Sequence, residues 1–184
     1  PYEKPLATLL TMIEVDPDDP AFADPSKPVG PVYTAEQAGD LERERGWVFR
    51  PDGKDFRRVV PSPAPKHIFE LRQISLLLEA GCVVICAGGG GIPTAYDVDG
   101  NLRGVEAVID KDHTSAILAA QLGADMFVIC TDVEKVCLDY RKPTQRTVDV
   151  LTVAECRAHM AAGQFPAGSM GPKISAMMVY ATRQ

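Results

Sequence analysis

The sequence has no block of basic residues, and its 19 lysines and arginines are outnumbered by 25 aspartates and glutamates, which gives a net charge of −6. Nucleic-acid-binding domains usually carry a basic patch, so we expect no nucleic acid partner. No apolar run approaches the roughly 18 residues that a membrane-spanning helix needs, so we also expect no membrane partner. These absences favour a soluble globular protein, and 184 residues are enough for one domain with a sizeable core.

The sequence also lacks a paired cysteine motif. Its five cysteines are an odd number without Cys-x-x-Cys spacing, and Cys82, Cys86 and Cys130 lie in apolar runs. Buried free thiols in a reducing compartment explain this pattern better than disulfides or zinc sites. We therefore expect a cytoplasmic protein with no metal site built from its own side chains.

Prolines are unevenly distributed, and most of the 15 lie between Asp16 and Pro65. Such density prevents long regular elements. Within this segment we expect a short helix over residues 35–46 and two strands, around Trp47–Phe49 and Phe56–Val60. A 50-residue loop without any structure would be unusual, so we expect residues 16–65 to form a small inserted subdomain that acts as a lid.

The rest of the chain alternates between helical and strand-like patterns. A helix that leads into a buried strand is half of an α/β unit, so this alternation predicts an α/β fold. We expect the strand before the glycines to be buried on both faces, because it is a continuous apolar run. The expected elements are strands over Leu6–Val15, Cys82–Ala87 and Ala124–Thr131, a hairpin over Tyr96–Val105, and helices over His67–Gly81, Asp110–Leu122, Val153–Ala162 and Pro172–Arg183.

The first candidate site combines a glycine run with a charged helix start. Glycines let the backbone take positive φ values and let a ligand approach the main chain, and successive N–H groups can form an anion-binding concavity. By themselves the glycines could be a flexible turn, and Asp110-Lys111-Asp112 a helix cap. Together, within about 25 residues, they favour a site for a phosphorylated or carboxylated ligand. The glycines are Gly88, Gly89, Gly90 and Gly91.

Two further segments lie where ligands often bind. Thr131 and Asp132 end a predicted strand, and ligands of open α/β sheets bind at the carboxyl ends of strands. Gly171-Pro172-Lys173 opens the last predicted helix, where backbone N–H groups and the lysine could face one phosphate. A capped helix with a solvated lysine is the commoner explanation of the second segment when it is taken alone.

Several motifs together resemble those of carbamate kinases, members of the amino-acid kinase superfamily. They are GGGGIP (Gly88–Pro93), GVEAVIDKD (Gly104–Asp112), TDVEKVCLDYRKP (Thr131–Pro143) and FPAGSMGPK (Phe165–Lys173). The proline-rich segment also resembles the protruding subdomain of that family, through DPSKPVGPVY and RRVVPSPAPK. The resemblance extends over essentially the whole chain, so we expect one partial amino-acid-kinase-like domain over residues 1–184.

The resemblance implies a three-layer α/β/α sandwich around a mainly parallel sheet and a homodimer. It also implies the reaction ATP + carbamate ⇌ ADP + carbamoyl phosphate with Mg²⁺, running towards ATP in arginine-type catabolism. Phosphoryl transfer needs mainly positioning and positive charge around the transferring group.

The resemblance assigns roles to individual residues as well. The amides of Gly88–Gly91 would hold carbamate and the transferring phosphoryl group, and Lys27 would reach over the carbamate from the lid. Lys111 and Lys173 would neutralise developing charge in catalysis, and Asp112 would organise these two lysines. The nucleotide would be bound by Thr131, Asp132, Tyr140, Lys142, Met170 and Lys173.

The chain departs from the family at both ends. Carbamate kinases begin with a strand and a Gly-Gly-Asn loop that binds ATP phosphates, and they continue past the last helix into further strands. Neither segment is present, so we expect an internal portion of a longer protein. Two alternatives stay open, another amino-acid kinase acting on a different acyl phosphate and a non-catalytic relative that keeps the fold. A nucleotide-binding oxidoreductase is disfavoured, because the glycines lack G-x-G-x-x-G spacing.

Overall fold

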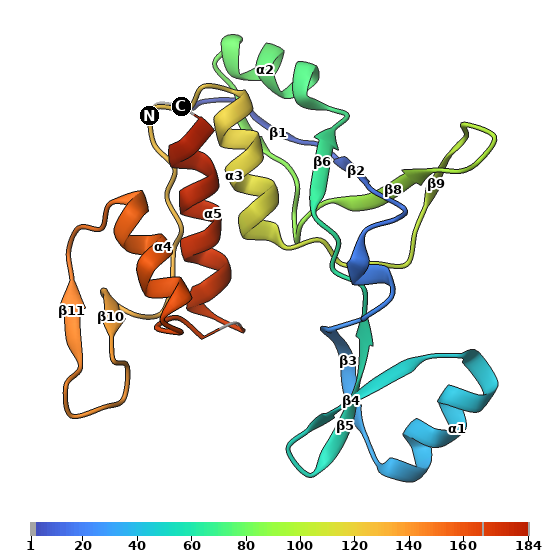
Figure 1. The fold of residues 1–184 in the computed structure, drawn as a ribbon. Helices are drawn as coiled ribbons and strands as arrows, with labels where there is room; N and C mark the ends of the chain where they lie inside the picture. Colours follow the sequence, from blue (N-terminus) through green and yellow to red (C-terminus); the bar gives the residue numbers. More distant parts are fainter. Residues whose placement is uncertain (1–2, 167, 184) are drawn as a thin grey trace. The chain divides into compact units, whose positions relative to one another are not determined.

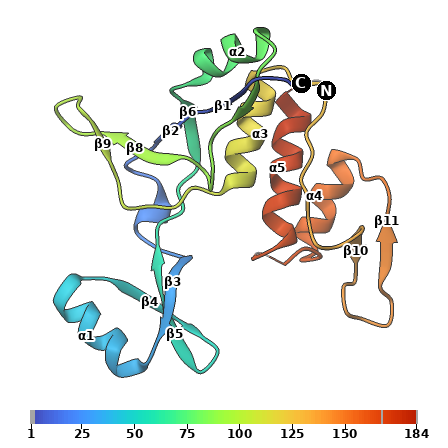
Figure 2. The same ribbon diagram turned by 180° about the vertical axis from the view of Figure 1, so that it is seen from behind.

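The computed structural model describes residues 3–166 and 168–183 of the chain. The chain folds into two compact units, Pro1–Asp110 and Lys111–Gln184. Figures 1 and 2 show helices and strands in both. Parallel and antiparallel strand pairs occur together with helices, so the predicted α/β fold is confirmed.

The largest sheet of the first unit has four strands in the order β6-β2-β8-β9. The two central strands, β2 and β8, are parallel, and both outer strands are antiparallel to their neighbours. Ile13 of β2 and Ile68 of β6 are fully buried, which places a hydrophobic core on this sheet. The predicted hairpin is confirmed as β8–β9. The strands are β2 (Met12–Val15), β6 (Pro65–Ile68), β8 (Ile92–Tyr96) and β9 (Leu102–Gly104).

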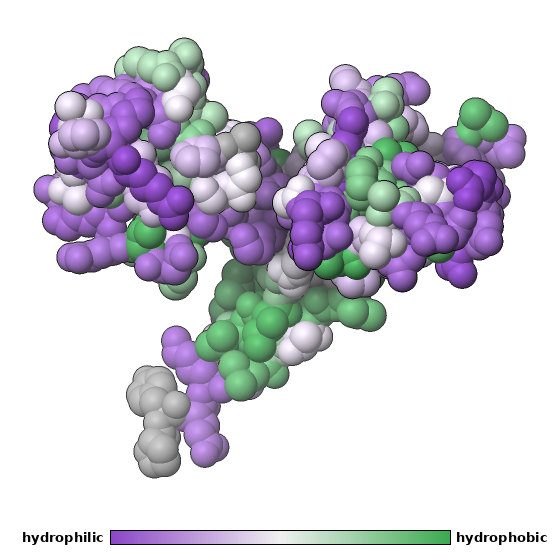
Figure 3. All heavy atoms as spheres, turned by 90° about the horizontal axis from the view of Figure 1, so that it is seen from below, coloured by the Kyte–Doolittle hydropathy of each residue, from purple (hydrophilic) through white to green (hydrophobic). Residues whose placement is uncertain are grey.

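The predicted strand Leu6–Val15 is two strands, β1 (Leu6–Thr8) and β2, and β1 pairs in parallel with β7 (Val83–Ile85). The expected burial of β7 on both faces is wrong, because Val83 is 44% exposed and Ile85 54% exposed. Among the described residues β7 pairs with β1 only, so its other edge is unpaired, and Val83 and Ile85 lie together on an exposed face of the ladder. Figure 3 shows a patch of hydrophobic atoms on a face that is otherwise largely hydrophilic.

The helix predicted over His67–Gly81 starts later than expected. The residues before it pair with β2 as strand β6, and α2 therefore occupies only Leu71–Glu79. Ile74 is buried, and α2 packs against β7. Gly81 takes a φ of +81°, the left-handed conformation that ends a helix without steric cost.

The proline-rich segment contains a three-stranded antiparallel sheet in the order β3-β5-β4, together with helix α1. The predicted short helix is confirmed, because Thr34 and Gln37 form a reciprocal capping box and Gly46 ends the helix in the left-handed conformation. Ala38, Phe49 and Val59 are buried between these elements. The elements are η1 (Pro20–Phe22), β3 (Lys27–Tyr33), α1 (Ala35–Arg45), β4 (Val48–Asp52) and β5 (Asp55–Val60).

The second unit is built from three helices and a hairpin, and α3 packs along α5. The start of α4 is fixed by a capping box of Thr152 and Glu155. The core consists of Leu138, Cys156, Phe165 and Ile174. The elements are α3 (Lys111–Gln121), β10 (Val136–Leu138), β11 (Arg146–Val148), α4 (Val153–Ala161) and α5 (Met170–Arg183), so the last helix starts two residues earlier than expected.

The strand predicted over Ala124–Thr131 is wrong. This segment is irregular, and Met126 and Val128 are 75% and 66% exposed. A strand exists only when a neighbour accepts its hydrogen bonds, and the described residues provide no such neighbour for this segment. Within those residues, too, no helix is long and apolar enough to span a bilayer.

All five cysteines are free thiols, as expected. Burial raises the pKa of the Cys86 thiol, and burial together with the nearby Glu155 carboxylate raises the pKa of Cys156. The expectation that Cys130 is buried is wrong. Cys130 belongs to the irregular segment above, where no sheet covers its side chain.

Candidate active site

The glycine loop follows β7 and folds into tight turns. Gly88, Gly90 and Gly91 have φ values of 45°, 133° and 92°, all in the region that favours glycine. The N–H of Gly88 donates to Cys86 O and that of Gly90 donates to Ala87 O, each at 2.8 Å. Two of the four glycine amides are therefore used within the turn, and within the described part of the chain the amides of Gly89 and Gly91 remain to bind a ligand.

The glycines differ in the space around them. A Cβ on Gly90 would lie 2.1 Å from Ile109 O, and one on Gly91 would lie 2.2 Å from Ile13 Cγ1. A Cβ on Gly88 or Gly89 would meet no atom within 4 Å. Gly90 and Gly91 are thus required by packing, whereas the space beside Gly88 and Gly89 is open for a ligand.

This open space belongs to a pocket of about 490 Å³ in the first unit, which we call the N-terminal pocket. Thr11 lies at its edge, where its Oγ1 accepts a hydrogen bond from the N–H of Ala87 at 2.8 Å and donates to Leu9 O at 3.2 Å. These bonds fix the start of the glycine loop on the β1–β2 connection. The lining residues include Leu9, Thr11, Ile85, Gly88, Gly89 and Ile109.

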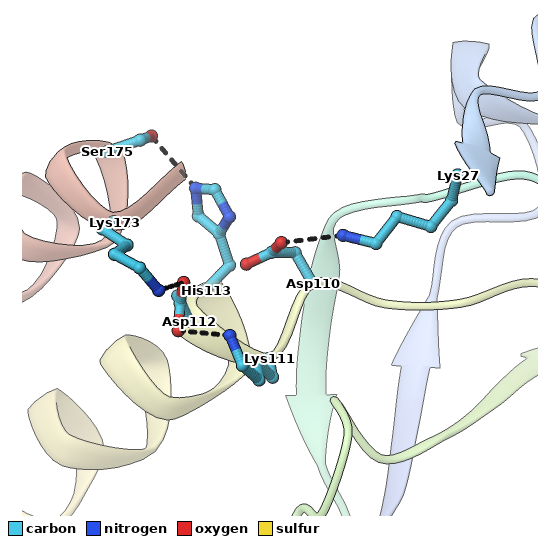
Figure 4. A network of polar contacts seen from close by, with 7 residues as sticks. All are labelled: Lys27, Asp110, Lys111, Asp112, His113, Lys173 and Ser175. Carbon is cyan, nitrogen blue, oxygen red and sulfur yellow. Dashed lines mark hydrogen bonds and ion pairs between the residues drawn. The ribbon is translucent and has the colours of Figure 1, made fainter. Parts of the chain in front are cut away.

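Lys27 forms an ion pair with Asp110, the residue that follows the contact of Gly90 with Ile109. Its Nζ lies 3.1 Å from Asp110 Oδ2, although the two residues are 83 positions apart in the sequence (Figure 4). Asp110 is partly buried and follows Ile109, whose carbonyl packs against Gly90. The structure therefore brings Lys27, the only site residue expected from the proline-rich segment, to the same backbone segment as the glycine loop.

In the second unit, Asp112 joins the two lysines that the sequence singles out. Its Oδ1 lies 3.0 Å from Lys111 Nζ and its Oδ2 lies 3.1 Å from Lys173 Nζ (Figure 4). Asp112 is buried in the first turn of α3, and Lys173 comes from the first turn of α5. A carboxylate between two ammonium groups offsets their mutual repulsion and holds them close together.

A second contact ties the same two helix starts together. His113 Nε2 lies 3.0 Å from Ser175 Oγ. His113 follows Asp112 in α3, and Ser175 lies two residues after Lys173 in α5. With the close packing of α3 along α5, this contact keeps the Asp112–Lys173 pair in register.

Lys173 also lines a pocket of about 560 Å³ in the second unit, which we call the C-terminal pocket. Five of the six side chains expected to bind nucleotide lie in its wall, namely Thr131, Asp132, Tyr140, Met170 and Lys173. The wall also contains residues to which the sequence assigned no role: Val133, Lys135, Cys137, Arg141, Gln164, Phe165, Pro166 and Ser169.

Lys142, the sixth expected nucleotide ligand, is not part of this wall. Its Nζ lies 3.2 Å from Asp139 Oδ1, on the exposed side of the loop. The neighbouring Arg141 lines the pocket instead, with its guanidinium 5.3 Å from the centre of the Tyr140 ring. Arg141 could have been predicted from the sequence, because it lies between Tyr140 and Lys142, which were both expected to bind nucleotide. Gln164 could not, because it reaches the wall only through the tertiary fold.

Comparisons with known proteins show which family and fold the chain is similar to. A sequence profile described as the amino acid kinase family matches residues 27–184. A carbamate kinase of Haemophilus influenzae is 55% identical over 181 residues, which are 98% of this chain and 57% of that protein. Among solved structures, the carbamate kinase from Giardia lamblia bound to AMP-PNP superposes with a TM-score of 0.89 at 40% identity, covering 99% of this chain and 58% of that one.

An Aeropyrum pernix K1 protein of known structure matches with a TM-score of 0.90 and 42% identity, over 97% of this chain and 58% of that one. The chain thus spans little more than half the length of the relatives that it matches.

Proposed function

The chain belongs to the amino acid kinase family, and on this premise we propose that it takes part in the transfer of a phosphoryl group between ATP and carbamate, giving ADP and carbamoyl phosphate. The observation that carries the proposal is the placing of Lys111 and Lys173 on one buried carboxylate, with Lys173 also in the wall of a pocket. Such an arrangement concentrates positive charge where a phosphoryl group would be transferred.

The C-terminal pocket suits a nucleotide. Lys135, Arg141 and Lys173 bring positive charge to its wall. Lys135 is paired with Asp149 and Lys173 with Asp112, so a polyanion would draw on these ammonium groups and on the Arg141 guanidinium. Apolar side chains in the same wall provide contact area for a base; they are Val133, Phe165 and Met170.

In this proposal the lysines act on the phosphoryl group itself. Charge spreads over the equatorial oxygens of the transferring group, and fixed ammonium groups stabilise it without reorganisation. Asp112 does not contact the substrate; it keeps both ammonium groups in place and reduces their mutual repulsion.

The N-terminal pocket would take carbamate or carbamoyl phosphate. The open space beside Gly88 and Gly89 allows the ligand to approach the main chain, where the N–H of Gly89 can donate to an anionic oxygen. Lys27 would supply a positive charge from β3, exchanging its contact with Asp110 for one with the substrate.

We also propose Mg²⁺ as the metal cofactor. Among the described residues, no cluster of three or more His, Cys, Asp or Glu side chains could hold a metal ion. Mg²⁺ is commonly bound through one or two carboxylates and substrate phosphates, and the residues present fit this mode, with Asp132 as the carboxylate in the C-terminal pocket. When bound, the ion would neutralise charge on the nucleotide phosphates.

The wider setting follows from the resemblance. We propose that the reaction runs towards ATP in arginine-type catabolism, that the protein is cytoplasmic, and that it forms a homodimer. Five free cysteines suit a reducing compartment.

Sedimentation velocity of the purified protein tests the dimer, and a single monomer boundary at micromolar concentration would contradict it.

The function is tested by ATP formation from ADP. With Mg²⁺ present, we expect carbamoyl phosphate to be used at least about 100-fold more efficiently than acetyl phosphate, because differential transition-state binding sets specificity. A preference for another acyl phosphate would favour a different amino acid kinase. Ligand-dependent thermal stabilisation without turnover would favour a non-catalytic relative.

We further propose that residues 16–65 form a lid that carries Lys27 towards the glycine loop. Three contacts join this segment to residues 106–110: the Lys27–Asp110 ion pair, an ion pair between Arg58 and Glu106, and a backbone hydrogen bond of 2.9 Å from Val108 N to Pro61 O. Opening would break these two ion pairs and one hydrogen bond, and we propose that they form and break as the lid moves. Closure would exclude water from carbamate, which decomposes readily in water, and strengthen the lysine contacts.

Hydrogen exchange tests the lid. We expect amides of Asp16–Pro65 to exchange faster than those of the central strand β2 (Met12–Val15), because the segment has a small core and few ties to the main sheet. Addition of ADP analogue and carbamoyl phosphate should slow exchange across the segment, and less so in Lys27→Met. Uniform protection that does not respond to ligands would mean a rigid subdomain.

A further inference from the structure

The loop between β10 and β11 is held in an unusual backbone conformation. Asp139 and Arg141 have φ values of 51° and 64°, although neither is a glycine. Residues other than glycine seldom take such values, and they keep them where surrounding contacts fix the backbone. Three of the contacts that fix this loop, Asp139–Gln145, are made by the side chain of Asp139.

The Asp139 carboxylate accepts three hydrogen bonds. Lys142 Nζ donates to Oδ1 at 3.2 Å and Thr144 Oγ1 donates to Oδ2 at 3.1 Å, which closes the loop on itself. Gln164 Nε2 donates to Oδ1 at 3.3 Å, and Gln164 Oε1 in return accepts the N–H of Asp139 at 2.7 Å. The reciprocal pair ties the loop to the segment after α4.

These two segments line the same pocket. Tyr140 and Arg141 from the loop line the C-terminal pocket, and Gln164 lines it from the segment after α4. Asp139 is not in the wall itself. Asp139 therefore lies outside the pocket wall and joins the two segments through its contacts with Gln164.

We propose that Asp139 is a positioning residue for nucleotide binding: its carboxylate fixes the β10–β11 loop against Gln164, so that Tyr140 and Arg141 face the nucleotide. The proposal rests on the proposed function of the C-terminal pocket. The charge of Asp139 matters because only a carboxylate accepts from all three donors at once. The hydrogen bonds from Gln164, Lys142 and Thr144, in that order, lower the pKa of Asp139, so the carboxylate is charged at neutral pH.

The test is the substitution Asp139→Asn, which keeps the shape but removes the negative charge that faces the Lys142 ammonium group. We expect the Kd of AMP-PNP, measured by calorimetry, to rise about tenfold, because hydrogen bonds to a charged group are lost. The KM of ADP should rise in parallel, while kcat at saturating ADP and the KM of carbamoyl phosphate stay within about twofold. A general loss of folding would affect all of these constants, whereas the proposal predicts a change only in the constants for the nucleotide.

The matched control is Asp99→Asn, which makes the same change of charge in the exposed β8–β9 turn and should leave all constants unchanged. If Asp139→Asn does not fold, Thr144→Val removes one hydrogen bond at the exposed end of the loop, and we expect a Kd about threefold higher. Wild-type affinity in a folded Asp139→Asn or Thr144→Val protein overturns the proposal.

Hydrogen exchange separates this proposal from the proposed function. In the wild type, Arg141 N–H donates to Gln145 Oε1 at 2.7 Å and Lys142 N–H donates to Asp139 O at 2.9 Å. Both amides should exchange faster in Asp139→Asn, with no ligand present. If the wild type binds no AMP-PNP, the proposed function fails, and unchanged exchange of these amides overturns the positioning role independently.

Discussion

Replacement of Lys173 by methionine is expected to lower kcat at least about 100-fold, because the loss of one preorganised charge at a reacting centre commonly has an effect of this size. Lys173 is well suited to this role: it pairs with the buried Asp112 and lines the C-terminal pocket. Methionine keeps the length of the side chain, and Asp112 keeps its contact with Lys111. The circular dichroism spectrum should therefore change little, whereas the melting temperature should fall, because the buried Asp112 loses one of its two lysines. The measurement is steady-state ATP formation at a temperature where the variant is folded.

Lys54→Met provides the matched control, since Lys54 is an exposed lysine in the turn between β4 and β5. The control should keep wild-type kcat and KM. Near wild-type kcat in Lys173→Met would show that the pair of Lys173 with Asp112 is only structural, and the proposed catalytic role would be lost.

Replacement of Gly90 by alanine is expected to lower the free energy of unfolding by about 3 kcal/mol or more, because a steric clash and a strained backbone act together. The new Cβ would lie 2.1 Å from Ile109 O, a backbone atom, and the φ of 133° is one that side chains rarely permit. Urea unfolding, followed by tryptophan fluorescence of Trp47 and by circular dichroism, measures the effect.

Gly89→Ala is the matched comparison, because a Cβ there meets no atom within 4 Å and faces open space. We expect Gly89→Ala to fold normally and to weaken carbamoyl phosphate binding, since the methyl group obstructs approach to the loop. The loop is a plain turn if this variant binds and turns over like the wild type. Equal stability of Gly90→Ala and wild type would contradict the packing of Gly90 against Ile109.

Much of the helical structure could be predicted because its determinants are local. Each capping box joins two residues that are three positions apart in the sequence, Thr34 with Gln37 and Thr152 with Glu155. Gly46 ends α1 because glycine takes the left-handed conformation without steric cost. The candidate lysines and glycines were also identified from the sequence, because they occur in short motifs. The sequence by itself therefore determined the α/β character, most helix ends and the chemical types present at the site.

Only the tertiary structure decided which apolar runs became strands. Ala124–Thr131 has the composition of a strand but remains irregular, whereas Pro65–Ile68 pairs with β2 and shortens the helix predicted there. The same holds for the site. Asp112 meets Lys173 from 61 positions away, Lys27 meets Asp110 from 83, and Gln164 meets Asp139 from 25. A strand or an ion pair depends on a partner that local sequence does not specify, so these contacts exist only once the chain has folded.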